Sequence, residues 1–117
     1  MINLCNGDPN ARTPNLDRLA AAGANFRRCY ATNPVCSPAK AAFQTGRYPH
    51  QTGVINNSIY LPEPKDSLAP CFARAGYATG DIGKGHLDGQ SKPGFVKPGR
   101  RQGYQFFEGF NRGHWYY

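Results

Sequence analysis

The sequence predicts an α/β fold in which short helices alternate with strands of a parallel sheet and are joined by long loops. Two helix–strand units can be traced along the chain, and each helix begins at a Thr or Ser and ends at a Gly. The 117 residues include 14 glycines and 10 prolines, so loops should occupy much of the chain. A chain of this kind buries little core, and we expect it to form part of a larger domain.

The first unit runs toward a cysteine. Thr13 suits the N-cap of a helix, Pro14 suits its first position, and Gly23 can end it. The apolar residues of this helix fall on one face, which should pack against a neighbour: Leu16, Leu19, Ala20 and Gly23. Residues Ala24–Ala31 are partly aromatic and alternate imperfectly, which predicts a short strand that leads to Cys36.

The next segment places Cys36 at the start of a second helix. Ser37 is a good N-cap, Pro38 suits the position after it, and Gly46 can end the helix in the left-handed conformation. Backbone N–H groups at a helix start bind oxyanions and stabilise a thiolate, and Lys40 adds a cation nearby. The residues alone therefore predict a sulfate, phosphate or carboxylate site beside a reactive cysteine.

The second unit follows an extended surface loop predicted over Arg47–Pro64. Ser67 can cap a short helix that Gly76 stops, and Tyr77–Ile82 is predicted as the strand after it. The helix should bury an apolar stripe formed by Leu68, Cys71, Phe72 and Ala75.

The loop after this strand carries Lys84 and His86. In an extended chain residues two apart project to the same side, so we expect an ammonium and an imidazole side by side. Segment Gly89–Gly103 is rich in Gly, Pro, Lys and Arg and is predicted to be a surface excursion. Segment Tyr104–Tyr117 is strongly aromatic and should pack against other parts of the protein.

The net charge of +7 is scattered over the chain. Arg27-Arg28 and Arg100-Arg101 are the adjacent basic pairs, and no basic run or stripe tracks phosphates, so a nucleic-acid-binding module is the least favoured interpretation. No stretch is apolar enough to cross a membrane, and residues Met1–Cys5 lack the features of a signal peptide. The compartment therefore stays unassigned.

The four cysteines have no C-x-x-C pair and no Cys/His ligand spacing, which argues against a zinc site. They are Cys5, Cys29, Cys36 and Cys71. Two disulfides remain possible from this count.

Several motifs in a fixed order carry a resemblance to a known family. They are Thr13–Ala20, Cys36–Lys40, Thr45–His50, Ala75–Gly80, Gly83–Leu87 and Gly109–His114. In these motifs the sequence resembles the N-terminal part of the type I, formylglycine-dependent sulfatases. The resemblance implies a fragment of an alkaline-phosphatase-like parallel-sheet domain. It predicts one partial catalytic domain over residues 1–117, with no internal boundary. We expect the family's first strand and paired aspartates to precede residue 1 and the later metal ligands to follow residue 117.

The resemblance also implies roles for individual residues. Cys36 matches the cysteine that is oxidised to formylglycine, whose hydrated aldehyde attacks the sulfur and later expels sulfate by re-forming the aldehyde. Lys84 matches the lysine that contacts the sulfate, and His86 matches the histidine that acts as a base. A calcium ion held by carboxylates is implied, with the formylglycine derived from Cys36 among its ligands. Lys40 stands where the family motif has arginine, and Gly85 where it usually has tryptophan.

The function implied by the resemblance is hydrolysis of sulfate esters. The substrate would be a sulfated small molecule or carbohydrate, and a formylglycine-generating maturation enzyme would be a partner. His50 and His114 are candidates to line the substrate pocket. The isolated chain is expected to have little or no activity, because the metal ligands lie outside it. Members of the family are often exported. Two alternatives remain: a sulfatase-like pseudoenzyme, and a phosphate-ester hydrolase that uses Cys36 as an unconverted thiol.

Overall fold

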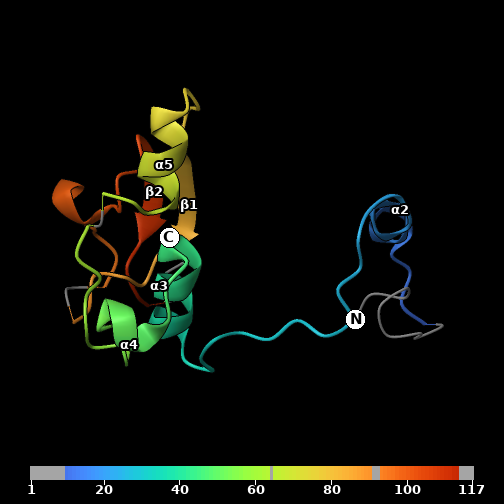
Figure 1. Cartoon of the computed structure of the whole chain (residues 1–117), viewed down its shortest axis with the longest axis horizontal. Helices are drawn as coiled ribbons and strands as arrows, with labels where there is room; N and C mark the ends of the chain where they lie inside the picture. Colours follow the sequence, from blue (N-terminus) through green and yellow to red (C-terminus); the bar gives the residue numbers. More distant parts are fainter. Residues whose placement is uncertain (1–9, 64, 91–92, 114–117) are drawn as a thin grey trace. The chain divides into compact units, whose positions relative to one another are not determined.

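The computed structural model describes residues 10–63, 65–90 and 93–113, and the chain divides into two compact units, residues 1–30 and 31–117 (Figure 1). Among the described residues, the first unit contains helix α2 (Pro14–Ala22), and the second contains three helices, a short 3₁₀ helix and two strands. The sequence-based expectation of one partial domain without an internal boundary stays a prediction.

Helix α2 confirms the first predicted helix, with Thr13 at the N-cap and Pro14 at the first position. The predicted packing of its apolar stripe stays a prediction: within residues 10–30 the helix has no buried residue, and Leu19 is 70% exposed. The predicted strand over Ala24–Ala31 is wrong. These residues are exposed and form no strand, since a strand needs a neighbouring backbone with which to pair.

Helix α3 (Cys36–Thr45) is the second predicted helix, but its N-cap is Val35 and not Ser37. The prediction for Ser37 is wrong because this hydroxyl donates to the backbone carbonyl of His86 and does not cap the first turn. The end of the helix is as predicted: Gly46 has a φ of 67°, and its N–H donates to the Ala42 carbonyl over 2.8 Å.

Strands β1 (Gly80–Lys84) and β2 (Phe106–Phe110) pair in parallel, so the predicted parallel α/β arrangement is confirmed. Gly80 lies opposite Phe106, and Lys84 lies opposite Phe110. The first strand thus begins later than the predicted Tyr77 and continues through Lys84. The second strand lies in the aromatic segment, where the sequence pattern predicted packing but no strand.

Helix α5 (Leu68–Arg74) confirms the third predicted helix, with Ser67 at its N-cap. The predicted apolar stripe is wrong, because Cys71 and Phe72 are exposed and Ala69 is buried. The ring of Phe72 instead meets the edge of Tyr77, with centroids 5.4 Å apart. The buried surface of this helix is therefore smaller than the sequence pattern predicted.

The core of the second unit is small and gathers residues from α3, from the segment after it and from the loop after β1. Its buried members are Ala41, Val54, Leu61 and Leu87, with Ile59 packed against them. The predicted surface loop over Arg47–Pro64 is therefore wrong in part, because this segment contains helix α4 (Pro49–Thr52) and supplies core residues. No helix in the described part of the chain is long and apolar enough to cross a membrane.

The segment Gly89–Gly103 also differs from its prediction. It contains the 3₁₀ helix η1 (Pro98–Arg100), and both Val96 and Gln102 are buried. The amide of Gln102 donates to the Leu61 carbonyl over 3.0 Å. This segment is therefore part of the packed structure, because its polar side chains find buried backbone partners that are distant in sequence.

Candidate active site

Cys36 is the first residue of α3, and its side chain is exposed. The preceding Val35 is extended, and its carbonyl accepts the Ala39 N–H over 3.1 Å, which closes the first turn. A residue in this position lies at the positive end of the helix dipole. The thiol is therefore presented to solvent in the electrostatic setting that the sequence predicted.

Asn57 lies beside the start of α3 and contacts two of its residues. Its Oδ1 accepts the backbone N–H of Ser37 over 2.9 Å, and its Nδ2 lies 3.9 Å from Cys36 Sγ. One amide thus satisfies a helix-start donor and approaches the cysteine. Asn57 lies within the segment predicted as a surface loop, and the adjoining Asn56 gives no sign of this contact.

Ser37 and Lys40 connect α3 to the chain around the end of β1. The Ser37 hydroxyl donates to the His86 carbonyl over 2.6 Å, and this serine is fully buried. The ammonium of Lys40 donates to the Lys84 carbonyl. The cysteine-bearing helix and the Lys84–His86 loop, predicted from separate motifs, are therefore joined by two hydrogen bonds.

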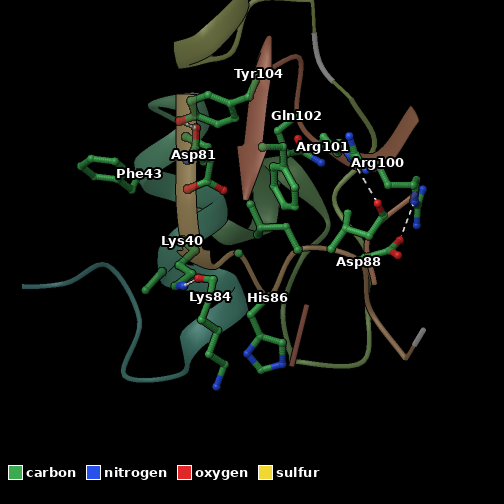
Figure 2. A pocket seen from close by; sticks show the side chains of 16 residues that line it. Lys40, Phe43, Asp81, Lys84, His86, Asp88, Arg100, Arg101, Gln102 and Tyr104 are labelled. Atoms are coloured by element: carbon green, nitrogen blue, oxygen red, sulfur yellow. Dashed lines mark hydrogen bonds and ion pairs between the residues drawn. The ribbon is translucent and has the colours of Figure 1, made fainter. Parts of the chain in front are cut away.

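Lys84 is the last residue of β1, and His86 follows it by two positions. Figure 2 shows their side chains extending on the same side of the backbone, beyond the end of the strand. The extended geometry assumed for this loop is wrong at His86, which has a φ of 56° in the left-handed region. The two side chains nevertheless come together, so the predicted ammonium and imidazole pair is present by a different backbone route.

The environment of His86 favours its neutral form. Burial lowers the pKa of His86, and the positive charges of Lys84, Lys40 and Arg112 lower it further. The residue is 7% exposed, and Nδ1 has no hydrogen-bond partner among the described residues. The imidazole is therefore suited to accept a proton at neutral pH.

Lys40 and Asp81 lie near each other on facing elements, α3 and β1. Burial lowers the pKa of Lys40, and Lys84 lowers it further, whereas Asp81 and Cys36 oppose that change. Burial raises the pKa of Asp81, and Lys40 and the Ile82 N–H oppose that change. Asp81 was missed by the sequence analysis, although a carboxylate inside a predicted strand was a usable signal.

A cavity of about 340 Å³ lies between α3, the strands and the segment around η1 (Figure 2). Both polar and aromatic side chains line it: the charged groups of Lys40, Asp81 and Lys84, the imidazole of His86, and the rings of Phe43, Tyr104 and Phe107. Cys36 and His50 are not among its lining residues. The cavity therefore opens beside the Lys84–His86 pair and not directly on the cysteine.

The remaining predicted site residues lie apart from this arrangement. His50 is the exposed second residue of α4, and its ring stacks on Tyr48 with centroids 5.8 Å apart. His114 lies outside the described residues. The described cysteines, Cys29, Cys36 and Cys71, are all free thiols, so the structure forms no disulfide between them.

The implied calcium site does not fit the residues that the structure describes. Calcium takes six to eight oxygen ligands, and carboxylates supply most of its charge balance. No group of three or more His, Cys, Asp or Glu side chains is clustered in residues 10–63, 65–90 and 93–113. The groups near Cys36 are the amide of Asn57 and the ammonium of Lys40, so these residues alone do not form such a site.

Comparison with known proteins identifies one family. The family model described as Sulfatase matches residues 4–117. The ulvan-active sulfatase of Formosa agariphila is 40% identical over 110 residues, which cover 94% of this chain and 22% of that protein. The human steryl-sulfatase is 35% identical over 120 residues, which cover 92% of this chain and 21% of that protein. The chain thus spans about a fifth of the length of these curated relatives.

Two solved structures resemble this one. The yidJ sulfatase homologue of Bacteroides fragilis superposes with a TM-score of 0.82 at 27% identity, over 96% of this chain and 29% of that chain. BT4656, solved with its substrate D-glucosamine-2-N,6-O-disulfate, gives a TM-score of 0.67 at 29% identity, over 84% of this chain and 21% of that chain. The prediction of an alkaline-phosphatase-like α/β fold is confirmed by these likenesses.

Proposed function

This chain belongs to the sulfatase family, and we propose that it forms the nucleophile-bearing part of an enzyme that hydrolyses sulfate esters. The observation that carries the proposal is the direct connection between α3, which starts at Cys36, and the loop with Lys84 and His86. The Ser37–His86 hydrogen bond of 2.6 Å holds the residue after the cysteine against the backbone of the imidazole residue. Nucleophile, cation and base are thereby supplied by adjoining elements.

In this proposal Cys36 is the precursor of formylglycine. A formylglycine-generating maturation enzyme would oxidise the thiol, and the exposed side chain at the start of a surface helix is accessible to such an enzyme. Formylglycine supplies a hydrated aldehyde, which is a nucleophile that can release sulfate without attack by water. The amide of Asn57, near Cys36 Sγ, is placed to orient the modified side chain.

Lys84 and His86 have separate roles. The ammonium of Lys84 would bind the oxygens of the sulfate group, where it balances their negative charge. The lowered pKa of His86 keeps its imidazole neutral near pH 7, so it can take a proton from the reacting hydroxyl. Both side chains extend on the same side of the loop, which supports a shared substrate position (Figure 2).

Lys40 has a positioning role in the proposal. Its ammonium donates to the Lys84 carbonyl, which fixes the end of β1 relative to α3. The same contact directs the ammonium toward the backbone and Asp81, and away from direct sulfate recognition. A lysine in place of the motif's arginine therefore keeps the two elements together but offers fewer donors to a bound anion.

The proposed substrate class is a sulfated carbohydrate or sulfated small molecule. The substrate that BT4656 binds is a sulfated glucosamine, and its likeness to this chain supports this class. His50 and His114 stay predictions as substrate contacts, because His50 does not line the cavity and His114 lies outside the described residues. A calcium ion is part of the family expectation, and it would need ligands from beyond the described residues.

The proposal can be tested on the full chain co-produced with a formylglycine-generating enzyme. Mass spectrometry of the Cys36 peptide should show conversion of the thiol to an aldehyde, and the exposed Cys71 should remain a thiol as an internal control. Hydrolysis of an aryl sulfate and of a sulfated glucosamine should then be compared with hydrolysis of an aryl phosphate. Conversion of Cys36 supports the proposal, and any sulfate release above that of Cys36→Ala would show the hydrolysis directly.

Two results would overturn it in favour of the alternatives. An unmodified Cys36 with phosphatase activity that thiol alkylation abolishes would identify a cysteine-dependent phosphate-ester hydrolase. An unmodified Cys36 with neither activity, in a preparation where a control sulfatase is converted, would identify a pseudoenzyme.

A further inference from the structure

We propose that Asn111 is a positioning residue for His86, because its side-chain amide forms hydrogen bonds with the backbone of Asp88 and Gly89, shortly after the histidine. The inference rests on the proposed function, in which His86 is the base. Asn111 comes directly after β2, and it is fully buried. The sequence motifs gave Asn111 no catalytic role.

His86 needs such support because its backbone is strained. Its φ of 56° lies in the left-handed region, which residues other than glycine rarely adopt. This conformation persists where surrounding contacts hold it, and such positions cluster at functional sites. The direction of the imidazole therefore depends on contacts made by the neighbouring backbone.

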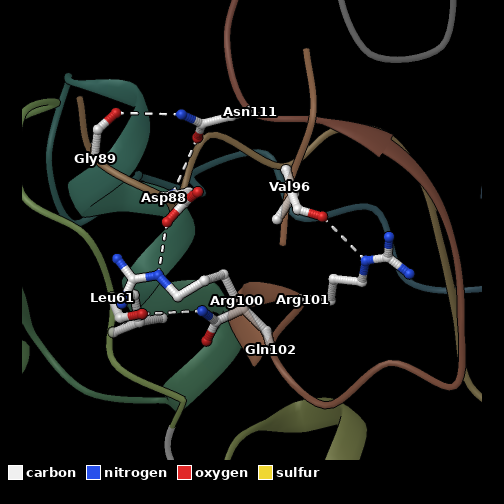
Figure 3. A network of polar contacts seen from close by, with 8 residues as sticks. All are labelled: Leu61, Asp88, Gly89, Val96, Arg100, Arg101, Gln102 and Asn111. Carbon is white, nitrogen blue, oxygen red and sulfur yellow. Dashed lines mark hydrogen bonds and ion pairs between the residues drawn. The ribbon is translucent and has the colours of Figure 1, made fainter. Parts of the chain in front are cut away.

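Asn111 supplies two of these contacts with one amide. Its Oδ1 accepts the N–H of Asp88 over 3.0 Å, and its Nδ2 donates to the Gly89 carbonyl over 3.2 Å. Its own N–H donates to the Gly94 carbonyl over 2.9 Å, which fixes the asparagine in turn. Figure 3 shows the amide placed between the backbone groups of residues 88 and 89.

The residue before Asn111 holds the other side of His86. The Phe110 carbonyl accepts the N–H of Gly85 over 2.9 Å. Two successive residues at the end of β2 thus hold the backbone before and after the histidine. Because these three bonds come from two consecutive residues at the end of one strand, they define the short span in which His86 must turn.

Asp88 adds a second anchor on the same segment. Its Oδ1 accepts from Arg100 Nε over 2.6 Å, and the Arg100 guanidinium lies 3.5 Å from the centre of the Tyr60 ring. A Cβ atom at Gly89 would approach the Ser58 carbonyl and the Tyr60 nitrogen to 2.9 Å, so the backbones pack closely there. The segment after His86 is therefore fixed by polar contacts and by close approach.

The test measures whether Asn111 controls the exposure of the imidazole. Diethyl pyrocarbonate modifies accessible histidines, and mass spectrometry can follow His86 separately, with the exposed His50 as an internal reference. In the full chain, Asn111→Ala should raise the rate at His86 about tenfold, because the loop opens more often when two hydrogen bonds are lost. The rate at His50 should not change.

Two further variants separate positioning from a general loss of stability. Ala69→Gly weakens α5 at a buried residue outside the loop, and it should leave the His86 rate unchanged. Asn111→Ser keeps a short polar side chain at the site, and it should raise the His86 rate by a smaller factor than Asn111→Ala, since it replaces an amide that makes two hydrogen bonds with a single hydroxyl. If Asn111→Ala fails to fold, Asn111→Ser decides the question, and an unchanged His86 rate in that variant would overturn the proposal.

An unchanged His86 rate in folded Asn111→Ala, or an equal increase in Ala69→Gly, would overturn the proposal. The readout needs no sulfatase activity, so a negative result here is distinct from failure of the proposed function. The imidazole NMR signals of His86 provide a second readout, and they should shift in Asn111→Ala and stay in place in Ala69→Gly.

Discussion

The hydroxyl of Ser37 lies 2.6 Å from the backbone carbonyl of His86, to which it donates a hydrogen bond across 49 positions of sequence. Ser37 is fully buried, and His86 is nearly so. A buried carbonyl that loses its hydrogen-bond donor stays unsatisfied, and this destabilises the folded state because no water replaces the donor. The start of α3 and the loop after β1 are therefore stabilised by a contact that neither element could make alone.

Replacing Ser37 with alanine should destabilise the chain by about 1–3 kcal/mol, because it leaves the His86 carbonyl unsatisfied. Urea unfolding followed by circular dichroism would measure the change. Ser58→Ala is a matched control, since Ser58 is exposed, and it should change the free energy of unfolding by less than about 0.5 kcal/mol. Equal effects of the two substitutions would contradict this account of the contact.

Lys40→Arg should increase the fraction of Cys36 that a formylglycine-generating enzyme converts. A guanidinium can keep the bond to the Lys84 carbonyl and offer further donors, whereas the ammonium is a point charge. We expect an increase of about tenfold in conversion rate, the equivalent of one hydrogen bond to a charged group. Mass spectrometry of the Cys36 peptide at a series of times provides the measurement, and equal rates would count against a role for this position.

Asp88→Ala should destabilise the chain by about 3–5 kcal/mol, because Arg100 would lose the partner of a largely buried ion pair. The side chain of Asp88 is only 6% exposed. Asp66→Ala removes an ion pair of similar type with Arg74, in which both side chains are exposed, and it should cost at most about 1 kcal/mol. A comparison of the two variants by urea unfolding tests whether burial sets the difference.

The stability of the chain should fall as the pH drops below about 6.5, the ordinary pKa of histidine. Folding lowers the pKa of His86, so below this pH the unfolded chain binds more protons than the folded chain. The contribution of His86 is fully present above its unfolded pKa and decreases as the pH falls toward its folded pKa.

Unfolding free energies measured at several pH values should show this slope in the wild type and a smaller slope in His86→Gln. His50→Gln is the control, because His50 is exposed on α4. A slope that is unchanged in His86→Gln would mean that other groups produce the acid sensitivity.

Local signals in the sequence were sufficient to predict the helices. Pro14 after Thr13, Ser67 before Leu68, and Gly46 at a helix end each act through the backbone of one turn, so neighbours in sequence decide the outcome. The start of α3 was misplaced because Ser37 has a partner far along the chain. The strand predicted before Cys36 failed for a related reason: a strand depends on a neighbour that a local pattern cannot supply.

The motif residues of the candidate site were predicted from the sequence, but the residues that hold them were not. Cys36, Lys84 and His86 belong to short motifs in a recognisable order. Asn57 and Asn111 lie in turn-like stretches, and their importance comes from hydrogen bonds to backbone groups twenty or more positions away. Burial of a polar side chain depends on where its hydrogen-bond partner lies in the fold, and the hydrophobic pattern of the sequence does not predict that position.

The parallel register of β1 and β2 limits where residues can be inserted into this chain or deleted from it. The Phe110 carbonyl and the Asn111 amide reach residues 85, 88 and 89 only when Lys84 stands opposite Phe110. Insertion of one residue between Lys84 and Gly89, or a slip of one position along β2, would move each donor and acceptor away from its partner. Insertions and deletions should therefore be tolerated in the exposed residues that follow α2 far better than in either of these two short stretches.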